Sequence, residues 1–156
     1  MATFEEAKKA VDEAYNNLFP IVDEIVKRYT KTSDDIVKTI GKDMEKLSKE
    51  QLRANILKLS SEAYFIGEVK ERASLRQELA EMIYKENVAK VYSVSTGTQK
   101  DKDNAAILAS TTEKMAELLH SAVESQLKTK IQGINNIVEN LKSVLISRIS
   151  EDKNLS

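Results

Sequence analysis

The stretch "VYSVSTGTQKDKDN", residues 91–104, interrupts a chain whose apolar residues otherwise recur at helical spacing on both sides. Ser95 and Thr96 are poor residues for a helix interior, and Gly97 can adopt the left-handed conformation that ends a helix. Asp103 can cap the helix that follows. We therefore predict that residues 93–103 are the polar loop of a helical hairpin.

Both flanks of this loop carry apolar residues at alternating steps of three and four, which is typical of coiled-coil-like helix packing. Ser48 and Gln51 form a capping box at the start of the first flank. Its apolar residues are Leu52, Ile56, Leu59, Ala63, Ile66, Val69, Ala73, Leu75, Leu79, Ile83 and Val88. Those of the second flank are Leu108, Met115, Leu119, Ala122, Leu127, Ile131, Ile134, Val138, Leu141 and Leu145. The pattern predicts two long antiparallel helices, over about 49–92 and 104–149.

The amino-terminal region, residues 1–47, is predicted to add further helices. Thr3 and Glu6 form another capping box. A seam of apolar residues follows it, made of Phe4, Ala7, Val11, Ala14, Leu18, Ile21 and Ile25. Pro20 lies within this seam and is expected to kink or split the helix near Phe19. A separate short helix is expected from Ile36 to Leu47, with Gly41 as a weak point.

Composition agrees with a single all-α domain spanning residues 1–156. The chain is 41% hydrophobic and 31% charged, and its one Pro and four Gly are too few for the turns of a many-stranded sheet. Cysteine is absent, so disulfides and thiolate chemistry are excluded. The amino terminus is too polar for a signal peptide, and no apolar run approaches the roughly 18 residues of a membrane span. We therefore expect a cytoplasmic protein, in the host cell cytoplasm if the chain is phage-encoded.

Catalytic chemistry is not expected. His120 is the single histidine, and with Glu117 it forms a Glu-x-x-His pair of the kind used in helical di-metal sites. Such a site needs a second pair, which the chain lacks. There is no glycine-rich phosphate loop and no nucleophile–base arrangement independent of His120. We therefore expect no catalytic residues, no metal, no cofactor and no enzymatic activity.

Charge is balanced over the chain but not around the predicted loop. The net charge of −1 argues against a protein that coats nucleic acid by bulk electrostatics. Residues 85–102 nevertheless carry Lys85, Lys90, Lys100 and Lys102 against only two acidic residues. A solvated helix surface is one interpretation of this excess. A track for phosphates is the other, because Tyr84 and Tyr92 supply aromatic faces beside the lysines.

A resemblance favours the second interpretation. The order of elements in "KERASLRQELAEMIYKENVAKVYSVSTGTQKDKDNAAILASTTEKMAELLHSAVESQLKTKIQGINNIVENLKSVL" resembles that of the UvsY-type recombination mediators, which are small helical phage proteins. The resemblance covers about residues 60–149. It implies a ring-forming protein that helps to load a recombinase onto single-stranded DNA covered by a single-strand binding protein. Basic residues before the turn contact DNA in that family, and Lys90 is nearest to that position, with Lys85 preceding it.

Two functions therefore follow as hypotheses. The first is an oligomeric recombination accessory that binds single-stranded DNA through Lys85, Lys90, Tyr92, Lys100 and Lys102, with a recombinase or single-strand binding protein as partner. The second is a helical protein–protein interaction module, such as an adaptor or an inhibitor of a host protein, with no nucleic-acid binding. The apolar seam near the carboxyl terminus could pack against the first helix of the same chain, whose seam matches it, but if Pro20 detaches that helix, one of the seams must be buried by another subunit. In either case we expect a homo-oligomer. The predicted oligomer interface consists of Ile131, Ile134, Val138, Leu141 and Leu145.

Overall fold

The protein is all-α, as predicted. The computed structural model describes the main chain of residues 4–155 and the side chains of residues 9, 12–14 and 16–154. Within this part of the chain there are no strands. The helices are α1 (Phe4–Ile40), α2 (Lys49–Val94), α3 (Gln99–Ala109) and α4 (Thr111–Leu155), with a 3-10 helix, η1 (Met44–Lys46), between α1 and α2.

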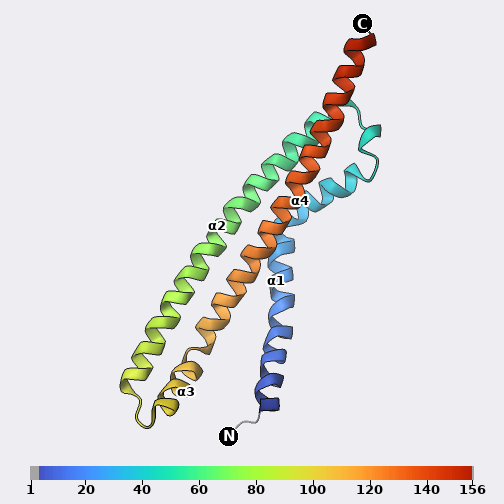
Figure 1. Cartoon of the computed structure of the whole chain (residues 1–156). Coiled ribbons are helices and arrows are strands. Elements are labelled where there is room, and N and C mark those ends of the chain that lie inside the picture. Colours follow the sequence, from blue (N-terminus) through green and yellow to red (C-terminus); the bar gives the residue numbers. More distant parts are fainter. Residues whose placement is uncertain (1–3, 156) are drawn as a thin grey trace. The chain divides into compact units, whose positions relative to one another are not determined.

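The long helices α1, α2 and α4 contribute to two compact units. Unit 1 combines Met1–Asp23 with Glu71–Ser125, and unit 2 combines Glu24–Lys70 with Gln126–Ser156. Within each unit, the segment of α2 and the segment of α4 run in opposite directions (Figure 1). The antiparallel helical hairpin predicted from the two apolar flanks is therefore confirmed.

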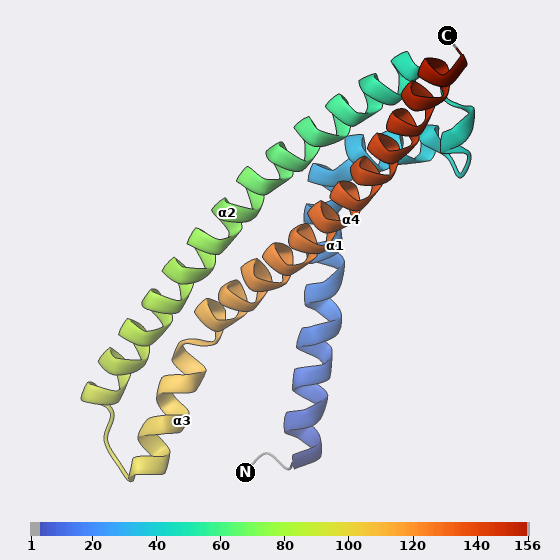
Figure 2. The same ribbon diagram turned by 45° about the horizontal axis from the view of Figure 1, so that its top comes forward.

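The turn of the hairpin is much shorter than the predicted loop of residues 93–103. Helix α2 continues to Val94, and α3 begins at Gln99 (Figure 2). Gly97 has a φ of 110°, so the expectation of a positive φ at this glycine is confirmed. The residue that caps α3 is Thr98, not Asp103, because the Thr98 hydroxyl accepts from the amide of Asp101 and the Asp101 side chain accepts from the amide of Thr98. Much of the polar stretch is thus helix.

A break at Ser110 separates α3 from α4, where a single helix was expected. The Ser110 amide donates to the carbonyl of Ile107 at 3.2 Å, which is a 3-10 contact, and the Ser110 carbonyl then accepts from Lys114 at 3.1 Å. The Ser110 side chain is buried at this position, and its hydroxyl has no hydrogen-bond partner among the described residues. The sequence does contain a signal for this break, since Ser110 and Glu113 have the spacing of a capping box, but the prediction of a single helix did not use it.

Helix α1 differs from the prediction for residues 1–47. It is not split at Pro20, which lies inside the helix. Pro20 and Asn16, whose carbonyl loses its hydrogen-bond donor, are both exposed, so water can replace the missing bond. The helix ends at Ile40, before Gly41, whose φ is 65°, so residues 36–40 belong to α1 and only the short 3-10 helix η1 forms separately in the range 36–47. Thr3 and the Glu6 side chain, which were predicted to form a capping box, lie outside the described residues.

The buried face of α1 is rotated by one residue from the predicted seam. Val22 and Val26 are buried, whereas Ile21 is 49% exposed and Ile25 is half-buried. The buried face continues through Thr30 and Ser33. Because both residues are polar, the apolar pattern of the sequence does not predict that they are buried. The side chains of Phe4, Ala7 and Val11, which belong to the predicted seam, lie outside the described residues.

The core of unit 2 contains the large aliphatic residues of all three long helices. Its buried apolar residues are Val26, Ile40, Leu52, Leu59, Ala63, Ile66, Leu127, Ile134, Val138 and Leu141. Three of these, Ile134, Val138 and Leu141, were predicted to contact another subunit. For them the interface is intramolecular, because α1 and α2 already cover this seam. Ile131 and Leu145 are half-buried and are the only members of the predicted interface with surface left for another chain.

The interior of unit 1 contains small residues instead. Its buried apolar residues are Val22, Ala73, Ala80, Ala106 and Val123. Ten of the fourteen large hydrophobic side chains that are exposed in the described chain belong to this unit. Burial of a Leu or Ile side chain stabilises a fold by about 1.5–3 kcal/mol, and an Ala contributes far less. Among the residues whose side chains are described, unit 2 therefore buries more large aliphatic surface than unit 1.

Candidate functional site

The predicted nucleic-acid site lies in unit 1, where α2 ends and α3 begins. Lys85 and Lys90 are on the last turns of α2, and each forms an ion pair one turn back along the same helix. The Lys85 ammonium is 2.5 Å from Glu81 Oε1, and the Lys90 ammonium is 2.6 Å from Glu86 Oε1. These hydrogen bonds lower the pKa of both glutamates, so both carboxylates are ionised at neutral pH. The two lysines therefore carry local counterions.

The structure brings Lys102 and Tyr92 together across the turn. The Lys102 ammonium lies 5.6 Å from the centroid of the Tyr92 ring, within the range of a cation–π interaction. The Tyr92 hydroxyl donates a hydrogen bond of 2.6 Å to Oε1 of Gln99. Lys100, on the first turn of α3, is exposed and has no ion-pair partner among the described side chains. One aromatic ring and two cations therefore share this end of unit 1.

The tip as a whole has no net charge. Residues 81–103 contain four lysines and four acidic residues. Asp101 is held in the capping box, where the Thr98 hydroxyl and amide lower the pKa of its carboxyl. The local excess of basic residues counted over 85–102 is thus cancelled by the acidic residues immediately outside that range. A phosphate chain would meet cations and carboxylates alternately.

The outer surface of α2 in unit 1 is a feature that the sequence analysis missed. Leu75, Leu79 and Met82 are 65%, 57% and 68% exposed. Steps of four and three place them on one face of the helix, directly opposite the face that contains buried Ala73 and Ala80. Leu75, Leu79 and Ala73 were all part of one predicted seam. This part of α2 has two apolar stripes about half a turn apart. Which of them is buried depends on which one α4 covers, and the sequence alone does not show that.

Polar side chains join α2 to α4 inside unit 1. The amide of Asn87 donates to Oε1 of Glu113 at 2.8 Å, while Oε2 of Glu113 is buried without a partner among the described residues. Lys114 lies 5.4 Å from the centroid of the Tyr84 ring, and its ammonium bonds Glu117, which raises the pKa of Lys114. Tyr84, like Tyr92, is thus half-buried with a lysine close to its ring.

His120 was considered with Glu117 as a weak metal-ligand pair. Burial lowers the pKa of His120, and the positive charge of Arg76 lowers it further. Glu117 is held by Lys114 at 2.8 Å. Over the residues that the structure describes, no group of three or more His, Asp or Glu side chains is arranged to hold a metal ion.

An apolar groove lies between α1 and α4 of unit 1. It has a volume of about 450 Å³ and is lined by Ala14, Asn17, Leu18, Ile21, Met115, Ala116 and Leu119. Leu18, Met115 and Leu119 are only half-buried along it. The groove and the outer face of α2 show that unit 1 leaves apolar surface open on more than one side.

Comparison with known proteins identifies no family for this chain. No family model, curated protein or solved structure matches the chain. In the part of the chain that the structure describes, no helix has an apolar segment long enough to cross a lipid bilayer.

Proposed function

We propose that this protein is a self-associating helical interaction module, and that a second copy of the chain binds to the outer face of α2 in unit 1. The observation that carries the proposal is the inverted distribution of apolar residues in this unit. Alanines occupy its interior, while Leu75, Leu79 and Met82 face solvent in a row. Contiguous exposed apolar surface of this kind marks an interaction site.

The charges beside this row favour a second copy in parallel orientation. Glu71 and Glu78 lie along one flank of the row, and Arg72 and Arg76 lie along the other. In a parallel pair of identical helices, each flank faces the opposite flank of the partner, so acidic side chains meet basic ones. An antiparallel pair would place arginines beside arginines. Glu86 ends the row, so the apolar contact from Leu75 to Met82 spans about one heptad and implies modest affinity.

The test is the mass of the protein in solution. Light scattering at tens of micromolar should return a multiple of the chain mass of 17.5 kDa. The triple variant L75Q/L79Q/M82Q should return 17.5 kDa with unchanged helical content, because none of the three side chains is in the core. A parent protein that is already monomeric at these concentrations would overturn the proposal.

Unit 2 offers a matched control. Leu57, Tyr64 and Ile146 are 69%, 74% and 64% exposed, so L57Q/Y64Q/I146Q removes similar apolar surface elsewhere. This variant should associate like the parent. Equal dissociation in both triple variants would show that association depends on general surface hydrophobicity, which contradicts a specific site on α2.

A second candidate function is binding of single-stranded DNA at the tip of unit 1. The observation in its favour is the contact of Lys102 with Tyr92, with unpaired Lys100 on the same end of α3. Aromatic rings that stack on bases, combined with cations that contact phosphates, are the elements of a sequence-independent single-strand site. A single tip has no net charge and offers few contacts to phosphates. An oligomer would present several tips to one DNA strand, and their phosphate contacts would add.

Fluorescence anisotropy of a labelled oligonucleotide tests this candidate. Affinity of the parent should fall with salt, with a slope of about 0.7 per phosphate contact. The variant K85Q/K90Q/K100Q/K102Q should flatten that slope. The control K27Q/K38Q/K42Q/K128Q removes four exposed lysines of unit 2. Equal losses in both variants, or no binding by the parent at low salt, would exclude a DNA site at the tip.

A further inference from the structure

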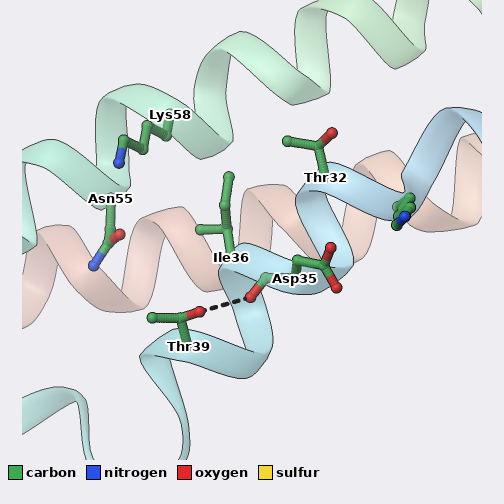
Figure 3. Close-up of a pocket in the computed structure, with 7 residues that line it drawn as sticks. Thr32, Asp35, Ile36, Thr39, Asn55 and Lys58 are labelled. Carbon is green, nitrogen blue, oxygen red and sulfur yellow. Dashed lines mark hydrogen bonds between the residues drawn. The ribbon is translucent and has the colours of Figure 1, made fainter.

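The break between α3 and α4 contains two buried polar atoms without a partner. Ser110 is fully buried, and neither its hydroxyl nor Oε2 of Glu113 forms a hydrogen bond among the described residues. A hydroxyl inside a helix can bond to the main chain one turn back, as the Thr39 hydroxyl of α1 does when it donates to the carbonyl of Asp35 at 2.9 Å (Figure 3). Because an unpaired buried polar group costs free energy, the break is less stable than a fully bonded one would be.

Ser110 and Glu113 have the spacing of a capping box, and the structure leaves this box unformed. The box at the start of α3 shows the geometry that is required. Thr98 there has a ψ of 164°, and its hydroxyl and amide both bond to Asp101. Ser110 precedes α4 in the same way, because its carbonyl accepts the first hydrogen bond of that helix, but its ψ is 15°. The observed break and a capped one therefore differ mainly by rotation about one main-chain bond.

A side chain of α2 holds the observed arrangement. The Asn87 amide donates to Oε1 of Glu113 at 2.8 Å, and the Ser110 amide donates to the carbonyl of Ile107 at 3.2 Å. In a capping box, the Ser110 amide would donate to the Glu113 carboxylate instead, and the Ser110 hydroxyl would accept from the Glu113 amide. Two hydrogen bonds are thus exchanged for two others. Two arrangements so closely matched differ little in free energy, and a small change can shift their populations.

Helix α3 is attached weakly enough to follow such a rotation. Ala106 is its only buried residue, whereas Ile107 and Leu108 are 56% and 77% exposed. A change in the orientation of α3 therefore exposes little additional apolar surface. At its other end, α3 is joined to α2 by residues 95–98, where Gly97 has no side chain to restrict the main chain. Both ends of α3 are thus able to rotate while α2 and α4 stay in place.

We propose that α3 is a lid that is hinged at Ser110 and has two orientations. In the closed orientation, which the structure shows, Asn87 holds Glu113 and Lys102 lies over the Tyr92 ring. In the open orientation, Ser110 and Glu113 form the capping box, Asn87 is released, and the Tyr92 ring is uncovered. The lid does not depend on self-association, because none of these residues belongs to the outer face of α2.

Distances between spin labels, measured by double electron–electron resonance, test for the two orientations. The chain has no cysteine, so A89C/N104C places one label on the exposed surface of α2 and one on that of α3. Dilution of the labelled protein into excess unlabelled protein removes distances between subunits. The pair A89C/L118C, on α2 and α4, is the control. We expect two distances for the first pair and one for the control.

Two variants should shift the populations seen with A89C/N104C in opposite directions. N87A removes the hydrogen bond that holds Glu113, so the ratio of open to closed lid should rise by about tenfold, the effect of one hydrogen bond to a charged group. S110A cannot form the capping box, and the ratio should fall by about tenfold. T112A changes an exposed residue on the first turn of α4 and should keep the parental ratio.

The proposal is overturned by a single distance in both the parent and N87A, because release of Glu113 would then leave α3 in place. It is also overturned if N87A and S110A shift the ratio in the same direction, or if T112A shifts it as much as either. S110A is independent of any effect of N87A on folding. An unchanged ratio in S110A alone would therefore exclude a hinge that depends on the capping box.

Discussion

Lys130 on α4 donates a hydrogen bond of 2.9 Å to Oδ1 of Asp34 on α1, and Oδ2 of the same carboxylate accepts one of 3.1 Å from buried Thr30. Ser33, also buried, donates to the main-chain carbonyl of Thr30 at 2.8 Å. These residues form a polar layer in unit 2 between apolar layers that contain Val26 and Ile40. A polar layer of this kind favours one register of α1 against α4, because a shifted register would separate Lys130 from Asp34, whereas the Thr30 and Ser33 hydroxyls bond within α1.

A double-mutant cycle on Asp34 and Lys130 should therefore show coupling. The side chains are 38% and 43% exposed, so solvent screening limits the pair to about 0.5–1 kcal/mol. Urea unfolding of D34A, K130A and D34A/K130A measures this quantity. Coupling indistinguishable from zero would mean that the pair does not contribute to the register.

Leu141→Ala should destabilise the protein by about 3 kcal/mol, because Leu141 is fully buried in unit 2 and its removal leaves a cavity. Leu57→Ala is the matched control in the same unit, since Leu57 is 69% exposed. Its effect should stay within about 0.5 kcal/mol. Chemical denaturation followed by circular dichroism compares the two. Similar losses in both variants would contradict the assignment of Leu141 to an intramolecular core.

The two glycines with positive φ should respond differently to alanine. At Gly41, with φ of 65° and open space around the added methyl group, we expect a loss of about 1 kcal/mol from backbone strain alone. At Gly97, with φ of 110°, the added Cβ would also lie 3.0 Å from Oδ2 of Asp101 and disturb the capping box. We expect about 2 kcal/mol there. Hydrogen exchange at the Lys102 amide, which donates to the Thr98 carbonyl, should accelerate only in G97A.

Stability should fall as pH decreases through the titration of His120. Its pKa in the folded chain lies below the ordinary value of 6.5, because burial and Arg76 disfavour the charged form. The unfolded chain therefore binds the proton first, so protonation favours unfolding as pH falls below 6.5. Urea unfolding between about pH 7.5 and pH 5.5, above the usual range of carboxylates, measures the slope. In H120Q the slope should disappear, and an equal slope in H120Q would assign the effect to another group.

Ser110→Ala should be neutral or should stabilise the protein by up to about 1 kcal/mol. The Ser110 hydroxyl is buried and has no hydrogen-bond partner among the described residues, whereas water solvates it in the unfolded chain. Thermal unfolding of S110A is the measurement. A loss above about 1 kcal/mol would show that the hydroxyl has a hydrogen-bond partner, such as a bound water.

Helix content and the hairpin were readable from the sequence because they depend on local periodicity. Steps of three and four residues, together with the capping box of Ser48 and Gln51, predict helices without any knowledge of the partner helices. That box forms as expected, with the Ser48 amide donating to Gln51 Oε1 at 2.8 Å. The loop was predicted too long because Lys100, Asp101 and Lys102 look like loop residues, although they are equally suited to the exposed first turns of α3.

Which apolar stripe is buried was decided only by the tertiary structure. Leu75 and Ala73 lie on opposite faces of α2, and the buried face in unit 1 is the one with alanines. Residues 81–103 similarly contain equal numbers of lysines and carboxylates. Only the folded helices show that Lys85 and Lys90 are paired, while Lys100 has no ion pair among the described side chains. Helix formation follows from interactions within a few residues along the chain. Burial and ion pairing depend on which surfaces meet, and residues distant in the sequence determine that.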